Sequence, residues 1–319
     1  MVRAIKVNCS TRPSCGKRTY PYRNGWHNHK GSAAMTYVNP DAIVSTQWLA
    51  DHLKAPDVRI VDASWYPPSA NRNGREEYDN EHIPGAVFFD IDEVADSANP
   101  LPHMLPAPEK FASKVRKMGL GNGNKIVIYD GTGFGSAAAR VWWMFRVFGH
   151  RDVCVLDGGL PKWLREQRAT EDLPPIPRDR HFIPHVNHSL VRDFDHMKAT
   201  IETGREQIVD ARAPGRFKGT DGEPWPVKQV GHMPGALNVP VQSLIDERER
   251  TMKPAAELKA IFDAAGVDMS KPIATTCGSG VTACVVALGL YLMGHKDVAV
   301  YDGSWSEWGN RDDAPVVQD

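Results

Sequence analysis

The chain has 319 residues, more than one hydrophobic core usually serves, so we expect two domains. Its composition is ordinary for a globular protein, and its longest apolar stretch, 284–294, is far shorter than the roughly 20 residues of a membrane helix. The formal net charge is −1 and no dense basic stripe is present, so neither a membrane nor a nucleic-acid partner is expected.

The first 35 residues differ in charge from the rest of the chain. They hold seven of the 38 basic residues and none of the 39 acidic ones, which leaves 31 basic against 39 acidic residues, a formal −8. Three interpretations stay open: a disordered tail, a weak organelle-targeting leader, or sequence translated ahead of a true start at Met35. The first and the last are preferred. The five cysteines, an odd number, favour a reducing compartment over a disulfide framework, and we expect the cytoplasm.

Beyond this leader, short apolar runs alternate with helical patterns. In the first half we predict strands over 58–62, 86–89, 125–129 and 153–156, and helices over 45–53, 108–118 and 136–148. A Pro-rich stretch over 170–187 has the composition of a linker. In the second half we predict strands over 207–210, 236–239, 273–276 and 298–301. This alternation predicts an α/β protein whose parallel sheets are covered by helices on both faces.

The chain also resembles itself at a spacing near 148 residues. The matching segments are 82–86 with 232–236, 60–63 with 208–211, and 156–159 with 301–304. Three matches in one order at nearly one offset indicate a duplicated domain, and a period this long means tandem domains. His82 and His232 hold matching positions, which favours a structural role over catalysis for both.

The most informative motif is Cys277 followed by Gly-Ser-Gly, between a predicted strand and a long apolar run typical of a helix. Glycines let backbone N–H groups curl around one point, and a helix N-terminus adds positive potential there, so both stabilise a thiolate. The alternative is a buried, inert thiol. The repeat aligns Cys277 with Asp130, so only one copy carries a nucleophile. This asymmetry predicts one active and one supporting domain, with the reactive site near their interface.

Other groups have simpler interpretations. We expect Cys154 in a strand core, and we expect Cys284 to pack inside a helix rather than act as a redox partner. No second ligand cluster accompanies Cys277 and Cys284, so a metal site is not expected. The Gly-rich segment 131–136 departs from a dinucleotide fingerprint, because Ser136 takes the place of its third glycine.

These features together resemble the tandem-domain rhodanese superfamily, and most closely its 3-mercaptopyruvate sulfurtransferases, over roughly 38–313. The motifs that carry the resemblance are DASWY (62–66), HIPGAVFFDID (82–92), PHMLP (102–106), RVWWMF (140–145), LDGGL (156–160), GRF (215–217) and CGSGVTA (277–283). Thiosulfate-using members usually carry Arg and Lys after the cysteine, whereas Gly278 and Ser279 look like the mercaptopyruvate type.

The resemblance implies two rhodanese-like domains, each a parallel β-sheet flanked by helices. Its segments are a basic extension over 1–37, a non-catalytic domain over 38–169, a linker over 170–190 and a catalytic domain over 191–319. It also implies a sulfurtransferase: Cys277 takes sulfur from 3-mercaptopyruvate as a persulfide, pyruvate leaves, and thioredoxin, a small thiol or cyanide accepts the outer sulfur. Neither a metal nor an organic cofactor is implied.

The resemblance further assigns roles residue by residue. Ser279, His103 and Asp92 match a proposed relay that moves protons during attack. Arg216 matches an arginine that holds the donor carboxylate. Without the resemblance, His103 is an ordinary loop histidine and Asp92 a helix-cap carboxylate. The remaining substrate-binding positions belong to the cysteine loop, whose N–H groups suit a persulfide: Gly278, Gly280, Val281 and Thr282.

The chain departs from the family pattern at one position that affects which sulfur donor it can bind. Family members usually have a second carboxylate-binding arginine nine residues after the first, where this chain has Trp225, and Lys228 is a nearby candidate replacement. Thiosulfate therefore stays open as an alternative donor, and a non-enzymatic persulfide carrier as an alternative function. A cysteine-dependent phosphatase is disfavoured, because Ala283 stands where that chemistry needs an arginine.

Overall fold

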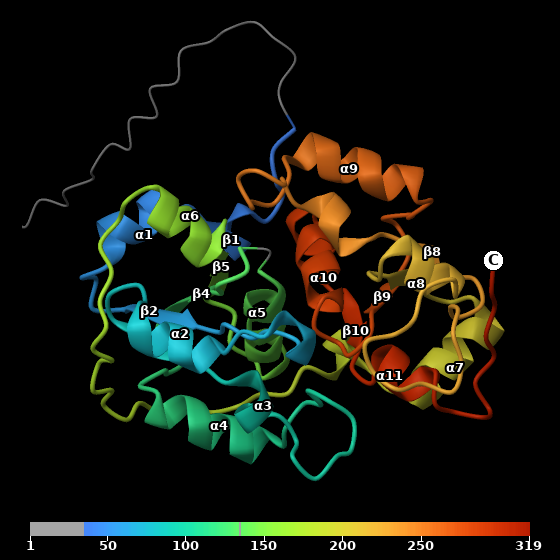
Figure 1. The fold of residues 1–319 in the computed structure, drawn as a ribbon, viewed down its shortest axis with the longest axis horizontal. Coiled ribbons are helices and arrows are strands. Elements are labelled where there is room, and N and C mark those ends of the chain that lie inside the picture. Colours follow the sequence, from blue (N-terminus) through green and yellow to red (C-terminus); the bar gives the residue numbers. More distant parts are fainter. Residues whose placement is uncertain (1–34, 134) are drawn as a thin grey trace, which may run out of the picture. The chain divides into compact units, whose positions relative to one another are not determined.

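Two five-stranded parallel sheets organise residues 35–133 and 135–319, which are the part of the chain that this computed structural model describes (Figure 1). The strand orders are β1-β5-β4-β2-β3 and β6-β10-β9-β7-β8, so one topology occurs twice. The predicted α/β duplication is thereby confirmed. The interpretations of the leader concern residues outside the described part.

The first sheet and its helices follow the predicted order. Its strands are β1 (Ile43–Val44), β2 (Val58–Asp62), β3 (Ala86–Phe88), β4 (Lys125–Tyr129) and β5 (Val153–Leu156). Its helices are α1 (Thr46–His52), α2 (Gly74–Asn80), α3 (Ile91–Val94), α4 (Pro108–Lys117), α5 (Ser136–Val147) and α6 (Gly159–Arg165), with 3-10 turns η1 (Pro40–Ala42) and η2 (Pro68–Ala70). Helix α1 begins one residue later than predicted, because the Ser45 hydroxyl accepts the Trp48 N–H and caps it.

The second half repeats this arrangement with shorter strands. Its strands are β6 (Val191–Arg192), β7 (Gln207–Asp210), β8 (Leu237–Asn238), β9 (Ile273–Thr276) and β10 (Ala299–Tyr301). Its helices are α7 (Phe194–Thr203), α8 (Pro214–Lys218), α9 (Ala255–Ala264), α10 (Ala283–Leu292) and α11 (Ser304–Trp308), with 3-10 turns η3 (His188–Leu190) and η4 (Val241–Leu244). The sequence does not predict the edge strands β1 and β6, since two residues show no alternation.

Side chains of the central strands alternate between two helical layers. In β4, Ile126 and Ile128 join the cluster that contains residues of α4 and α5, while Val127 and Tyr129 join the cluster with residues of α1, α2 and α6. All four side chains are buried, as expected for a parallel strand covered on both faces.

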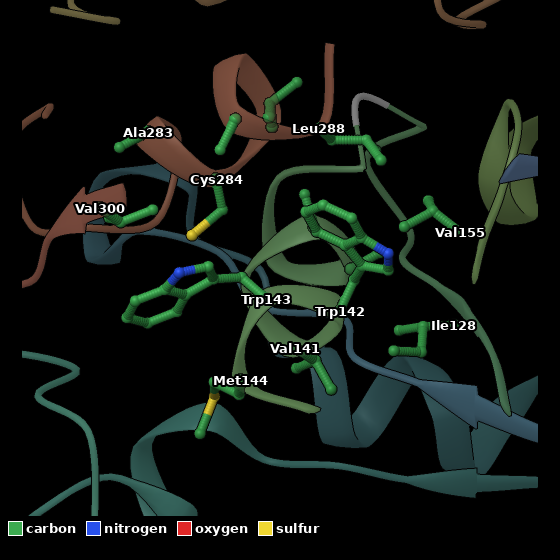
Figure 2. Close-up of a cluster of buried hydrophobic side chains, with 14 of the residues drawn as sticks. Ile128, Val141, Trp142, Trp143, Met144, Val155, Ala283, Cys284, Leu288 and Val300 are labelled. Atoms are coloured by element: carbon green, nitrogen blue, oxygen red, sulfur yellow. The ribbon is translucent and has the colours of Figure 1, made fainter. Parts of the chain in front are cut away.

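One hydrophobic core is shared by the two halves. Helices α5 and α10 pack against each other (Figure 1), and both are buried around almost their whole circumference. Figure 2 shows Trp142 and Trp143 of α5 beside Cys284 and Leu288 of α10. The cysteine loop directly precedes α10, so this shared core fixes it against the first domain. Within the described residues, no helix is long and apolar enough to cross a membrane.

Candidate active site

Cys277 lies between β9 and α10, at the predicted strand-to-helix turn, and its side chain is buried. The first residues of α11 form hydrogen bonds with the backbone of the loop. The Cys277 carbonyl accepts the Trp305 N–H at 3.0 Å, and the Gly278 carbonyl accepts the Ser306 N–H at 2.8 Å and its hydroxyl at 2.7 Å. The Cys277 N–H itself donates to the Ser304 hydroxyl at 3.2 Å. The backbone at the start of the loop is therefore tied to α11 by four hydrogen bonds.

The N–H groups of 278–282 donate no hydrogen bond to any group of the described residues. The carbonyls of Gly278, Gly280, Val281 and Thr282, by contrast, all accept hydrogen bonds. Gly280 has φ +74°, a conformation that costs glycine little. A Cβ at this position would lie 2.7 Å from the Asp302 carbonyl oxygen. The loop thus presents several unbound donors next to a buried sulfur, as an anion site requires.

Asp92 and His103 of the first domain form the predicted pair. The Asp92 Oδ1 lies 2.7 Å from His103 Nδ1, and Trp65 donates its indole N–H to the other carboxylate oxygen at 2.8 Å. Burial alone would raise the pKa of Asp92, but the interaction with His103 and the hydrogen bond from Trp65 outweigh it and hold the pKa below its ordinary value. His103 Nε2 is buried and has no hydrogen-bond partner in the described part of the chain.

Ser279, the third member of the predicted relay, is also buried. Among the described residues its hydroxyl forms no hydrogen bond, either to His103 or to any other group. The structure therefore joins Asp92 to His103 but does not join Ser279 to them.

Arg216, on the short helix α8, reaches the cysteine loop. A Cβ added at Gly278 would lie 2.7 Å from its Nη2 atom, so glycine is what allows the guanidinium to approach. Arg216 also forms an ion pair with Glu223, whose side chain is only 2% exposed. Part of the positive charge of Arg216 is thus neutralised by the protein itself.

Trp225 and Lys228 do not supply the second cation. The Trp225 ring lies edge-on to the His103 ring, with 6.4 Å between centroids. Lys228 Nζ instead contacts the exposed Asp312 at 2.9 Å. The hypothesis that Lys228 replaces the usual arginine therefore finds no support in this arrangement.

Comparison with known proteins places these residues in a family. Residues 45–166 and 193–311 each match the model of the rhodanese-like domain. The chain belongs to the rhodanese-like family. It is 44% identical to 3-mercaptopyruvate sulfurtransferase from Homo sapiens over 272 residues, which are 84% of this chain and 91% of that protein. It is 46% identical to thiosulfate sulfurtransferase from Bos taurus over 276 residues, 85% of this chain and 92% of that protein.

The fold of this rhodanese-like protein also matches a solved relative. SseA from Escherichia coli, described as a 3-mercaptopyruvate sulfotransferase, superimposes with a TM-score of 0.76 at 41% identity, covering 83% of this chain and 99% of that one. The predictions of a tandem rhodanese fold and of a sulfurtransferase enzyme are confirmed. The roles given to individual residues, the domain boundaries and the cytoplasmic location stay predictions.

Two buried arginines were missed by the sequence reasoning. Arg212, beside β7, binds Asp210 through two nitrogens and Glu223 at 2.7 Å, and so holds the partner of Arg216. Burial lowers the pKa of Arg212, but the attraction of Asp210 and Glu223 outweighs this and raises it above the ordinary value. The repeat contains a signal for this residue, since its counterpart 148 positions earlier is Ser64.

Arg140, the second, extends from α5 of the first domain to the cysteine loop of the second. It donates to the carbonyls of His103 and Gly280 and pairs with Asp302. The sequence places it in a family motif but offers no reason for its charge, because its partners lie far away along the chain.

Proposed function

We propose that this rhodanese-like protein transfers sulfane sulfur from 3-mercaptopyruvate, through a persulfide on Cys277, to a thiol or cyanide. The observation that carries the proposal is the loop 277–282: in the described part of the chain the N–H groups of 278–282 donate no hydrogen bond, and they directly follow a buried cysteine beside Arg216. Such donors stabilise an anionic sulfur in both the thiolate and the persulfide state.

In the proposed reaction the Cys277 thiolate attacks the sulfur of the donor. A sulfur–sulfur bond forms, the carbon–sulfur bond breaks, and its electron pair leaves with the pyruvate enolate, which then takes up a proton. His103 is suited to proton transfer, because Asp92 orients its ring through Nδ1 and leaves Nε2 without a partner among the described residues. An acceptor thiolate then attacks the outer sulfur and releases the Cys277 thiolate.

Arg216 is proposed to hold the donor carboxylate, with Ser279 assisting loss of the thiol proton. Because Glu223 neutralises part of Arg216 and Trp225 adds no charge, the site suits a monocarboxylate better than the dianion thiosulfate. Thioredoxin or a small thiol is the proposed acceptor, and a reducing compartment, the cytoplasm, is the proposed location.

Donor assays on the purified full chain test the proposal. With cyanide as acceptor, we expect kcat/KM to be larger for 3-mercaptopyruvate than for thiosulfate; a much larger value for thiosulfate would overturn the choice of donor. Cys277→Ser is expected to abolish turnover and the one-sulfur mass increase after donor treatment, with Cys284→Ser as the matched control. An absence of added sulfur on wild-type Cys277 would contradict sulfur transfer by this residue.

A further inference from the structure

Arg140 is the one charged group of the first domain that is fully buried against the cysteine loop in the described part of the chain. It lies on α5, and its guanidinium stacks over Trp143, a member of the shared core labelled in Figure 2, at 4.5 Å from the ring centroid. Its nitrogens reach the Gly280 carbonyl at 3.2 Å, the His103 carbonyl, and Asp302 Oδ1 at 2.7 Å.

The direction in which a residue's carbonyl points fixes the direction of the N–H group of the next residue. In a trans peptide the C=O of one residue and the N–H of the next point to opposite sides of the chain. The Cys277 and Gly278 carbonyls are bound by α11, which directs the N–H groups of Gly278 and Ser279 away from that helix. The Gly280 carbonyl is bound by Arg140 and by the Cys284 thiol at 3.2 Å, so the Val281 N–H points away from Arg140.

The same guanidinium also fixes the loop that carries His103. This residue has φ +62°, a strained value for a non-glycine residue, and its carbonyl accepts a hydrogen bond from Arg140. Two residues later, the Leu105 N–H donates to Asp302 Oδ2 at 2.8 Å, and Asp302 is the ion-pair partner of Arg140. One buried ion pair therefore holds parts of the site from both domains.

We propose that Arg140 is a positioning residue for sulfur transfer: it orients the Gly280–Val281 peptide toward the reacting sulfur and holds His103 in register with Cys277. The inference rests on the proposed function. It gives the domain without a nucleophile a specific role in the site. Among the described residues, the charged groups of Arg140, Asp302 and Arg216 approach the loop, and the Cys284 thiol donates to its Gly280 carbonyl.

Arg140→Lys tests the role, because lysine keeps the charge but cannot bind Gly280, His103 and Asp302 together. We expect kcat to fall by about 10- to 100-fold with the donor KM within about threefold, since an oriented N–H acts on developing charge and Arg216 still binds the donor. Alkylation of Cys277 by iodoacetamide at pH 7 is expected to slow as well. Arg140→Met/Asp302→Asn is the second variant, which avoids a lone buried carboxylate that would impair folding.

Arg146→Met is the matched control. Arg146 lies on the same helix and also reaches the second half, at the Lys296 carbonyl (3.0 Å) and over the Tyr291 ring, but it does not touch the loop. We expect it to lower the Tm while kcat and the alkylation rate stay within about twofold of wild type. The same pattern in Arg140→Lys and in the double variant would overturn the proposal. If no donor adds sulfur to the wild type, the proposed function fails, whereas the alkylation rates still decide the role of Arg140.

Discussion

Gly280→Ala examines directly whether the loop geometry matters for catalysis. Alanine in the left-handed conformation at φ +74° costs about 1–2 kcal/mol. The new Cβ would also lie 2.7 Å from the Asp302 carbonyl oxygen and 3.1 Å from Arg140 Nη1, so the loop must move. Overpacking of this kind costs about 1–3 kcal/mol, which brings the loss of stability to about 2–5 kcal/mol.

Gly235→Ala separates the backbone cost of a positive φ from the displacement of the loop by the new Cβ. Gly235 belongs to the same domain and has φ +75°, but an added Cβ there meets no atom within 4 Å. It should therefore lose only the backbone cost of about 1–2 kcal/mol and keep its activity. We expect kcat for Gly280→Ala to fall by about 100-fold or more at a temperature where both variants are folded, because displacing an oriented donor weakens stabilisation of the anion. Thermal unfolding and the cyanide assay measure the two quantities. Equal kcat values in the two variants would refute the reasoning.

Two further predictions concern the donor site and its proton-transfer pair. Trp225→Arg should lower KM for 3-mercaptopyruvate by about three- to tenfold, because the new arginine can form a partly exposed ion pair with the donor carboxylate. Trp225→Leu is the uncharged control. An unchanged KM would mean that the donor does not reach residue 225. Asp92→Asn should lower kcat by at least about tenfold, because the His103 ring loses its orienting carboxylate. The folded pKa of Asp92 lies below its unfolded value of about 3.9, so the ionised pair stabilises the fold above about pH 4 and is lost as the pH falls through the lower folded value. Acid unfolding midpoints that are the same for Asp92→Asn and wild type would contradict this contribution.

Comparison of the predicted with the observed strands shows which strands are determined by their local sequence. The strands β2, β4, β5, β7 and β9 were predicted with their exact bounds, because each is an apolar run between turn residues and is buried on both faces. The bounds of β3, β8 and β10 differ by one or two residues, since their ends pair only partly with their neighbours. The edge strands β1 and β6 form only because β5 and β10 offer a free side.

The sequence by itself determined the duplication, the single nucleophile and the turn that carries it, since these depend on residue identity and short spacing. Only the tertiary structure decided what surrounds the nucleophile. Arg140 donates a hydrogen bond to the carbonyl of Gly280, 140 residues later in the chain. Glu223 forms an ion pair with Arg216, and Lys228 forms one with Asp312, not with a group of the site. Such pairings depend on how two sheets and their shared α5–α10 core bring distant side chains together, and no local pattern encodes that geometry.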